Sequence, residues 1–169
     1  MTDHVFCKQR QNPSAAIFRL ALFLKEITVT YTWSNNFNEI DWNELSELFR
    51  IAPLGKKSPE HLELVFNSSL FKFIVMDFGK IIGAGRALAD GADCSYICDV
   101  VIHPEYQGMG IGKQLVKKLI DASSDHAKII MYANPGKEGF YLSMGFKFMT
   151  TAMAIFKNET FAIESGVVK

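Results

Sequence analysis

Residues 100–113 of this chain read Val100-Val101-Ile102-His103-Pro104-Glu105-Tyr106-Gln107-Gly108-Met109-Gly110-Ile111-Gly112-Lys113. The run starts with β-branched residues, continues through a His-Pro pair and ends in three glycines at alternate positions. β-Branched residues favour a strand, and the apolar spacing that follows Gly112 is typical of a helix. We therefore predict a strand, a glycine loop and a helix, in that order. The first amides of such a helix lack partners, so the pattern favours binding of a phosphate or pyrophosphate.

Two common nucleotide-binding patterns fail here on spacing. A Gly-x-Gly-x-x-Gly fingerprint that starts at Gly108 requires glycine at a position occupied by Lys113. A Walker pattern that ends at Gly112 requires an earlier glycine where the chain has Gln107. The pattern that remains is Gln-x-x-Gly-x-Gly, made by Gln107, Gly110 and Gly112.

Length and composition exclude several classes of protein. A chain of 169 residues fits one domain, and its 18 basic and 18 acidic side chains balance, so we expect no nucleic-acid partner. The apolar segment 15–24 is interrupted by Arg19 and is too short to span a bilayer, so we expect no membrane partner. The histidines are scattered and show no zinc spacing, so we expect no metal.

The cysteines indicate a reducing compartment. Cys94 and Cys98 lie in one predicted strand, roughly 13 Å apart, which is too far for a disulfide. The third cysteine, Cys7, is distant in sequence. We therefore expect free thiols in a cytoplasmic protein.

Apolar periodicity predicts the other elements and the domain boundaries. Strands are expected at 27–33, 71–76, 80–89, 94–102, 129–132, 146–149 and 152–156, with the second and third forming a hairpin. Helices are expected after Asp41, after Ser58, after the glycine loop and at 138–143. Strand 129–132 is apolar throughout, which predicts burial on both faces. We expect an N-terminal extension (1–26), a single domain (27–157) and a C-terminal tail (158–169).

Two motifs together resemble the GCN5-related N-acetyltransferases, the GNAT superfamily. They are the glycine hexapeptide after Val-Ile-His-Pro and, further along, Phe140-Tyr141-Leu142-Ser143-Met144-Gly145-Phe146. The resemblance covers residues 27–156, and segment 99–104 and the C-terminal half are similar to a subgroup that includes plant serotonin N-acetyltransferase-like proteins. It implies an α/β (α+β) fold, with a mixed central sheet of about six or seven strands flanked by about four helices. The fourth and fifth strands, parallel in this family, would splay apart.

The resemblance also implies acetyl-CoA as co-substrate, with no metal. By similarity, the loop residues that would surround its pyrophosphate are Gln107, Gly108, Met109, Gly110, Ile111, Gly112 and Lys113. The strand residues Val100, Val101 and Ile102 would run beside the pantetheine arm. Asn134 would bind the pantetheine or the acceptor, although asparagine before Pro135 is also a common turn former.

Tyr141 resembles the general acid of the family. A phenol has a pKa near 10, so it stays protonated at neutral pH and can donate a proton to a departing thiolate. The alternative is a tyrosine that packs beside Phe140 and Phe146. The base stays open between Asp99, Glu138, water and the residues that stand at the usual positions, Tyr96 and Cys98. Asp99 would face the opposite side of the sheet unless a bulge resets the register.

The predicted function is therefore an acetyl-CoA-dependent N-acetyltransferase, in which a primary amine attacks the thioester directly in a ternary complex. A small-molecule acceptor is favoured, with an aralkylamine as one candidate. The alternatives are a peptide or protein acceptor, an acyl-CoA sensor without catalysis, a non-enzymatic interaction protein, and an acyl-carrying Cys98. The aromatic residues before the hairpin would line either the acceptor pocket or the core; they are Tyr31, Trp33, Phe37 and Trp42. A homodimer is left open.

Overall fold

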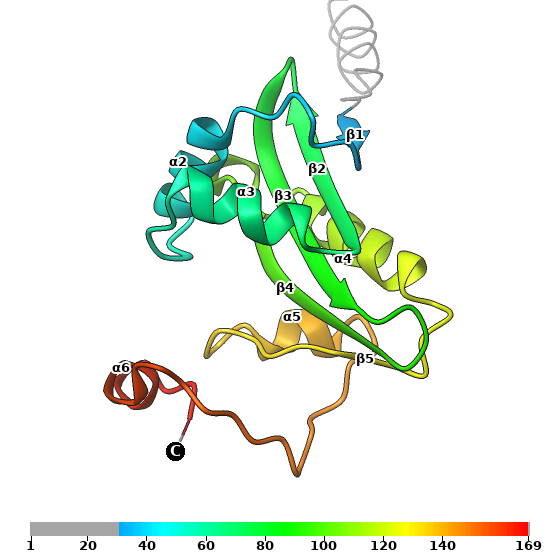
Figure 1. The fold of residues 1–169 in the computed structure, drawn as a ribbon, viewed down its shortest axis with the longest axis vertical. Helices are drawn as coiled ribbons and strands as arrows, with labels where there is room; N and C mark the ends of the chain where they lie inside the picture. Colours follow the sequence, from blue (N-terminus) through cyan, green and yellow to red (C-terminus); the bar gives the residue numbers. More distant parts are fainter. Residues whose placement is uncertain (1–30, 169) are drawn as a thin grey trace, which may run out of the picture. The chain divides into compact units, whose positions relative to one another are not determined.

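The computed structural model of the protein describes residues 31–168. The predicted extension 1–26, Cys7 and the start of the first predicted strand lie outside these residues. Five strands form one mixed sheet in the order β1-β2-β3-β4-β5 (Figure 1). Their bounds are β1 Thr32–Ser34, β2 Phe71–Asp77, β3 Lys80–Ala89, β4 Cys94–Ile102 and β5 Lys128–Ile130. Neighbouring strands are antiparallel except for β4 and β5, which are parallel.

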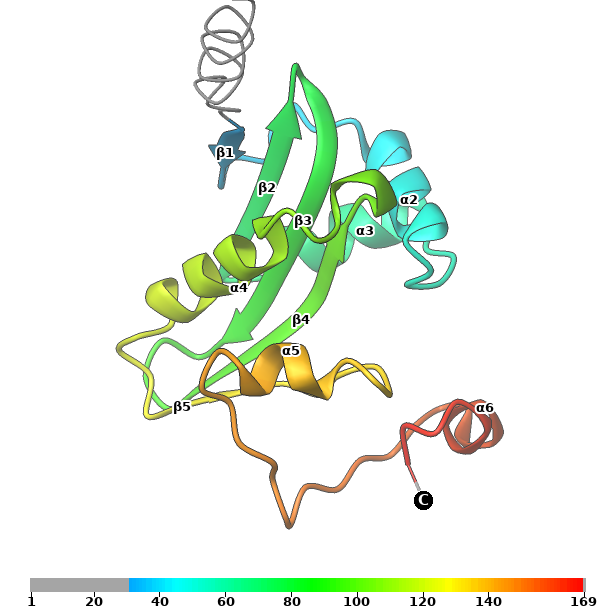
Figure 2. The ribbon, with the colours of Figure 1, turned by 180° about the vertical axis from the view of Figure 1, so that it is seen from behind.

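The first two helices of the described chain begin at the capping residues that the sequence indicates. The side chain of Asp41 accepts hydrogen bonds from the first turn of α2, Trp42–Ile51. Ser58 does the same for α3, Pro59–Asn67, where proline occupies the first helical position. Both helices pack on one face of the sheet, and α4, Ile111–Ala122, packs on the other (Figure 2).

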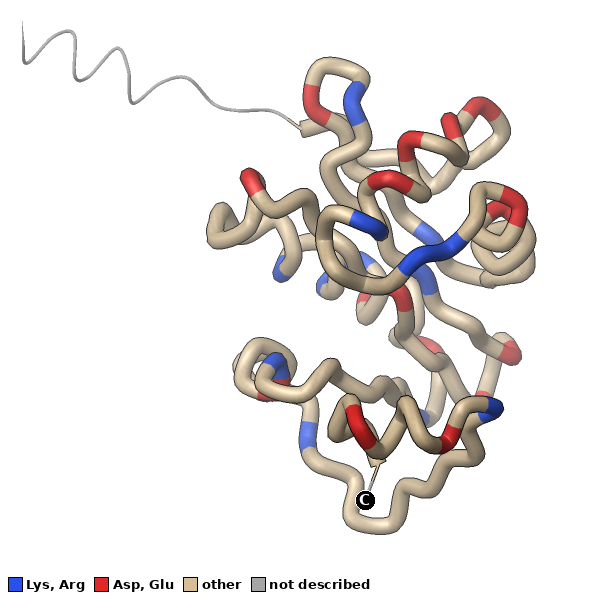
Figure 3. The backbone as a smooth tube through the Cα atoms, turned by 90° about the vertical axis from the view of Figure 1, so that its left-hand side faces the viewer, with Lys and Arg blue, Asp and Glu red and all other residues tan. Residues whose placement is uncertain are grey.

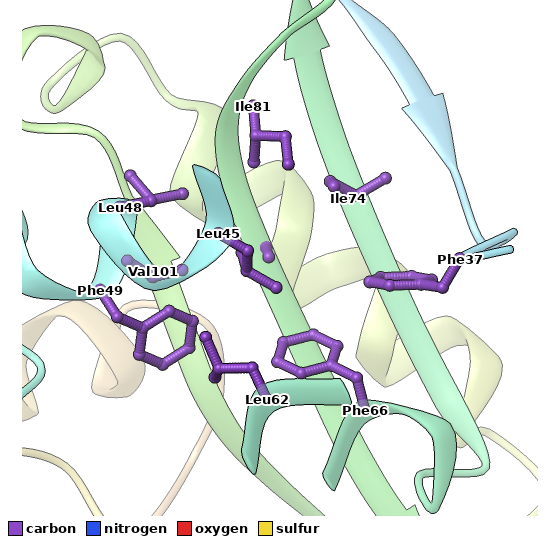
Figure 4. Packing of buried hydrophobic residues seen from close by; sticks show 10 residues of the cluster. Phe37, Leu45, Leu48, Phe49, Leu62, Phe66, Ile74, Ile81 and Val101 are labelled. Atoms are coloured by element: carbon purple, nitrogen blue, oxygen red, sulfur yellow. The ribbon is translucent and has the colours of Figure 1, made fainter. Parts of the chain in front are cut away.

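The core between the sheet and helices α2 and α3 is built from large apolar side chains (Figure 4). Phe66 of α3 is fully buried, and its ring centroid lies 5.3 Å from that of Phe37 and 6.3 Å from that of Trp42. Phe37 and the half-buried Trp42 therefore pack in the core, as the core alternative predicts, and a place for Trp42 beside the acceptor stays a prediction.

Helix α4 packs closely against strand β3 because that strand contains glycine at the point of contact. A Cβ atom on Gly85 would stand 3.2 Å from Leu119 Cδ1 and 3.3 Å from the nearest atoms of Leu115. Real side chains seldom tolerate contacts this short, so a larger residue would require Leu115 and Leu119 to shift.

The predicted strands at 146–149 and 152–156 are wrong, because the described chain forms no strand after β5. Segment 146–156 pairs with no strand of the described residues and leaves most of its apolar side chains in solvent; Phe148 is 70% exposed and Ile155 is 103% exposed. The prediction that 129–132 is buried on both faces is also wrong. Strand β5 is an edge strand, shorter than expected, and Tyr132 beyond it is 56% exposed.

Three further elements complete the described chain. They are the 3-10 helix η1 (Pro104–Tyr106) and the short helices α5 (Glu138–Leu142) and α6 (Glu159–Glu164), the last lying in the predicted tail. Acidic and basic residues are interspersed along the chain (Figure 3). Within residues 31–168, no helix is long and apolar enough to cross a membrane.

Candidate functional site

The loop between β4 and α4 adopts a conformation that requires glycine. Gly108 and Gly110 have φ values of 80° and 82°, in the left-handed region that other residues seldom enter. Gly110 is the N-cap of α4 and provides no side-chain acceptor for the first turn of the helix. The N–H groups of Ile111, Gly112 and Lys113 are therefore available to a ligand, at the positive end of the helix dipole.

Gln107 ties this loop to the end of β4. Its side-chain amide Nε2 donates a hydrogen bond of 3.0 Å to the carbonyl oxygen of Ile102. Lys113 is the exposed cation of the first turn, whereas Lys117 pairs with Asp121 and Lys118 lies over the ring of Trp33. Of the three helix lysines, only Lys113 lies beside the open amides.

Strands β4 and β5 pair for only a short distance. Their three paired positions are Cys94–Lys128, Ser95–Ile129 and Tyr96–Ile130. From residue 97 to residue 102, no strand of the described chain pairs with β4 on its β5 side, and we call this stretch the free edge of β4. Val100, Val101 and Ile102 all lie in it, with Val101 1% exposed because its side chain packs into the α2–α3 core. The backbone of the three residues can thus pair with a ligand while their side chains pack.

Tyr141 lies on α5, whose Phe140 contacts the first turn of α4. The ring centroid of Phe140 lies 4.9 Å from that of Tyr141, and Phe140 Cζ is 3.6 Å from the position that a Cβ atom on Gly112 would take. Tyr141 also lines a hollow of about 910 Å³ with Glu138 and Tyr132; residues 100–113 do not line it. Burial raises the pKa of the Tyr141 phenol, so the group stays protonated well above neutral pH.

Asn134 follows β5 in a tight turn. Its carbonyl oxygen accepts a hydrogen bond of 3.0 Å from the N–H of Lys137, and Asn134 is exposed to solvent. The turn-forming interpretation therefore holds, and a binding role for its side chain stays a prediction.

The candidate bases on β4 are poorly suited to accept a proton at neutral pH. Burial raises the pKa of the Tyr96 phenol, and burial likewise raises the pKa of the Cys98 thiol. Burial alone would raise the pKa of Asp99, but the hydrogen bond and charge of Lys57 and the charge of Arg86 outweigh it and hold that pKa below its usual range. The same thiol pKa argues against Cys98 as an acyl-carrying nucleophile, because only the thiolate is nucleophilic.

A bulge brings Asp99 to the same face of the sheet as Cys98. The β3–β4 register shifts between Ala84 and Arg86, and Asp99 has a φ of 52°. Its carboxylate accepts hydrogen bonds from Lys57 and Arg86, the latter at 2.6 Å from Arg86 Nε. Neither cation was predicted, because no local sequence pattern links an aspartate to residues 42 and 13 positions away.

An aromatic cluster, formed by Tyr96, Tyr132 and Phe156, lies where β4 and β5 separate. Tyr96 and Tyr132 stack with ring centroids 6.2 Å apart, and Phe156 meets Tyr132 edge to face at 6.3 Å. This cluster was not predicted, because the aromatic residues considered for the acceptor pocket all lie before the hairpin. The signal that could have found it was Tyr132, an aromatic residue at the end of the fifth predicted strand.

Comparisons with known proteins agree with this geometry. The model of the Acetyltransferase (GNAT) family matches residues 35–146, so the chain belongs to this family. An uncharacterized N-acetyltransferase ycf52-like protein of Prochlorococcus marinus is 30% identical over 112 residues, which cover 63% of this chain and 62% of that protein. Serotonin N-acetyltransferase 2, chloroplastic, of Oryza sativa subsp. japonica is 26% identical over 113 residues, covering 63% of this chain and 56% of that one. The chain thus spans less than two thirds of the length of these relatives.

A solved structure shares the fold at low identity. A probable acetyltransferase from meticillin-resistant Staphylococcus aureus, of unknown function, matches with a TM-score of 0.68 at 18% identity. The match covers 75% of this chain and 98% of that one. The predicted mixed α/β architecture with parallel β4 and β5 is therefore confirmed, with fewer strands than expected.

The residues present fit acetyl-CoA, the co-substrate of this family. A pyrophosphate requires N–H donors that no side chain obstructs, and the glycine loop and first turn of α4 supply them. A pantetheine arm carries amides that pair with an open strand, and the free edge of β4 offers one. Within residues 31–168, no cluster of His, Cys, Asp and Glu could hold a metal ion.

Proposed function

We propose that this protein is an N-acetyltransferase that transfers the acetyl group of acetyl-CoA to a primary amine. The single observation that carries the proposal is the left-handed Gly110 at the N-terminus of α4, next to the free edge of β4. Such a helix end favours a pyrophosphate, and such an edge favours an extended chain of amides. Membership of the acetyltransferase family supports the same activity.

Each part of the co-substrate has its own group of binding residues in this proposal. The amides of Gly108, Met109, Gly110, Ile111, Gly112 and Lys113 bind the pyrophosphate. Gln107 holds the loop in place through its bond to Ile102. The backbone of Val100, Val101 and Ile102 pairs with the pantetheine arm. The side-chain amide of Asn134, just past β5, donates a hydrogen bond to the same arm.

Tyr141 is the general acid. Acetyl-CoA supplies an acetyl thioester, at whose carbonyl carbon the new C–N bond forms as the C–S bond breaks. N–H groups of the free edge of β4 donate to the carbonyl oxygen, where negative charge develops. Tyr141 Oη then gives its proton to the sulfur, and its raised pKa supports this role because the phenol is protonated throughout the physiological range.

The amine loses its proton to water in this proposal. Tyr96 and Cys98 have raised pKa values and are already protonated, and the carboxylate of Asp99 is engaged by two cations. Glu138 shares the hollow with Tyr141 and is the remaining side chain that could relay a proton through water. Direct attack by a neutral amine in a ternary complex therefore needs no dedicated base.

The acceptor is a small amine that carries an aromatic ring. The aromatic cluster supports this choice, since an open ring such as that of Tyr132 gains from stacking against another ring. A peptide acceptor is the alternative. One relative named above is a serotonin N-acetyltransferase, which acts on an amine of this kind by its name.

A second candidate function is an acetyl-CoA sensor without catalysis. The observation that favours it is the unsuitability of Tyr96, Cys98 and Asp99 as bases at neutral pH. Thiol release from acetyl-CoA, measured with aralkylamines, polyamines, amino acids, aminoglycosides and lysine peptides, separates the two. Release with any amine supports the transferase. Thermal stabilisation by acetyl-CoA without release supports the sensor, and the absence of both contradicts the whole proposal.

We also propose a homodimer and a cytoplasmic location. No strand of residues 31–168 pairs with the outer edge of β5, and Phe148, Met153 and Ile155 are exposed; these features support pairing with a second copy, because a strand edge beside apolar side chains favours association. Light scattering on the full chain and on Ile155→Asp tests the proposed homodimer.

The rice relative is named as chloroplastic, so fractionation of cells is the test of the proposed cytoplasmic location.

A further inference from the structure

Strand β4 contains a bulge in which Asp99 and Val100 stand opposite the single residue Gly85 of β3. Asp99 has a φ of 52° there, whereas most residues other than glycine, asparagine and aspartate avoid this region. A backbone conformation of this kind persists only where its surroundings hold it. The contacts of the Asp99 side chain show what those surroundings are.

Both carboxylate oxygens of Asp99 are occupied by cations. Lys57 Nζ donates to Oδ1, and Arg86 Nε donates to Oδ2 at 2.6 Å. The three side chains are largely shielded from water, with exposed fractions of 14% for Asp99, 11% for Arg86 and 24% for Lys57. Shielding of this degree makes the pairs stronger and less sensitive to salt than pairs on an open surface.

The cations are themselves fixed to the α2–α3 side of the molecule. Arg86 Nη1 donates to Ser69 Oγ at 3.2 Å, and Ser69 Oγ donates to the carbonyl oxygen of Val65 in α3 at 2.7 Å. Lys57 lies in the loop just before α3, where the carbonyl oxygen of Lys57 accepts a hydrogen bond from Ser46 Oγ at 2.6 Å. The bulge is therefore connected to both ends of α3, through Lys57 at its N-terminal end and through Arg86 and Ser69 at its C-terminal end.

The bulge lies within the free edge of β4, past the last position that pairs with β5. We infer that Asp99 is a positioning residue, whose two ion pairs hold the bulge and so set the course of the strand edge that binds acetyl-CoA. The inference rests on the proposed function for what binds at that edge. It assigns Asp99 a role other than that of the base, because two ion pairs stabilise the charged carboxylate and so oppose its taking a proton from the amine.

Two variants separate the positioning role from the role of a base. Asp99→Asn keeps the shape and tolerates the left-handed backbone, but it removes the charge that holds Lys57 and Arg86. Lys57→Met keeps the aliphatic length and removes one of the two cations. The matched control is Asp93→Asn, which breaks an exposed ion pair of 2.5 Å with Lys128 at the start of β4.

Three measurements are made on the full chain. Hydrogen exchange of the amides 97–102 is followed without ligand, acetyl-CoA affinity is measured by calorimetry without amine, and kcat/KM is measured against pH. For both Asp99→Asn and Lys57→Met we expect exchange about tenfold faster in 97–102 and an acetyl-CoA Kd about tenfold higher, because the edge opens more often. The acidic limb of the pH profile should stay where it is, and Asp93→Asn should match the wild type in all three.

A catalytic base would give the opposite pattern. Exchange and affinity would be unchanged, Asp99→Asn would lose the acidic limb, and Lys57→Met would move that limb to higher pH, because losing a neighbouring cation raises the pKa of a carboxyl group. That result, or unchanged exchange in Asp99→Asn, overturns the inference. Failure of the wild-type protein to bind acetyl-CoA would overturn the proposed function instead, and the exchange data would still decide whether the ion pairs hold the bulge.

Discussion

Phe140 packs against Gly112, with Phe140 Cζ 3.6 Å from the place that a Cβ atom on the glycine would occupy. This contact joins α5, which carries Tyr141, to the first turn of α4, which carries the open amides. The helices that carry the proposed proton donor and the proposed pyrophosphate site are thus in contact, although they come from separate parts of the sequence.

Gly112→Ala tests whether a ligand approaches the backbone there. The glycine is helical and a methyl group would meet only ordinary contacts at 3.6 Å, so the folded state should gain up to about 1 kcal/mol from helix propensity. If the pyrophosphate lies against this residue, the acetyl-CoA Kd should rise in spite of the gain in stability. Thermal unfolding and calorimetry measure the two effects. An unchanged Kd would place the close approach elsewhere in the loop.

Tyr141→Phe removes the proposed proton donor and little else. We expect kcat to fall about a hundredfold or more, the usual contribution of a general acid, with little change in acetyl-CoA Kd. Because burial raises the pKa of this phenol, the activity of the wild type should persist to pH values above the usual range of tyrosine. Tyr106→Phe is the control, since it removes a phenol that donates to Asp77 and is expected to affect stability alone. Equal kcat in Tyr141→Phe and the wild type would refute the assignment.

Tyr132→Ala tests the aromatic acceptor. Removal of the exposed ring should raise KM for an aralkylamine about tenfold, in line with the energy of an aromatic pair, while KM for an aliphatic amine of equal length stays the same. Tyr132→Phe should restore selectivity, because it keeps the ring. Steady-state kinetics with the two amines supply the measurement, and equal losses for both amines would count against the cluster as an acceptor platform.

Asp90 should give the fold a dependence on acidic pH. Hydrogen bonds from the N–H groups of Ala92, Cys94 and Asp93 lower the pKa of its carboxyl group to about 2. A lowered pKa means that the contribution is present above the pKa of the unfolded chain and is lost as pH falls towards about 2. The stability difference between wild type and Asp90→Asn, from urea unfolding, should therefore shrink between about pH 5 and pH 2. A difference that does not vary with pH would contradict this account.

The sequence could predict features that depend on interactions between residues close together in the chain. The helix caps at Asp41 and Ser58 and the glycine loop before α4 each involve only a few neighbouring residues, so their sequence patterns were sufficient to predict them. The ion pairs of Asp99 join residues far apart in sequence, and a bulge that moves a side chain to the other face leaves no periodic signal. Segment 146–156 has the composition of strands, but a strand also needs a neighbour that pairs with it, and the sequence does not say whether one is present.

Calorimetry on a matched pair of glycine variants tests most directly whether the glycine loop binds acetyl-CoA. Gly110→Ala and Gly91→Ala both place a side chain at a left-handed position, with φ of 82° and 84°, and a Cβ atom meets nothing within 4 Å at either site. Both should lose about 1–2 kcal/mol of stability. We predict saturable binding of acetyl-CoA to the wild type and to Gly91→Ala, and at least about tenfold weaker binding to Gly110→Ala. No binding to the wild type, or equal affinity in the two variants, would contradict the claim.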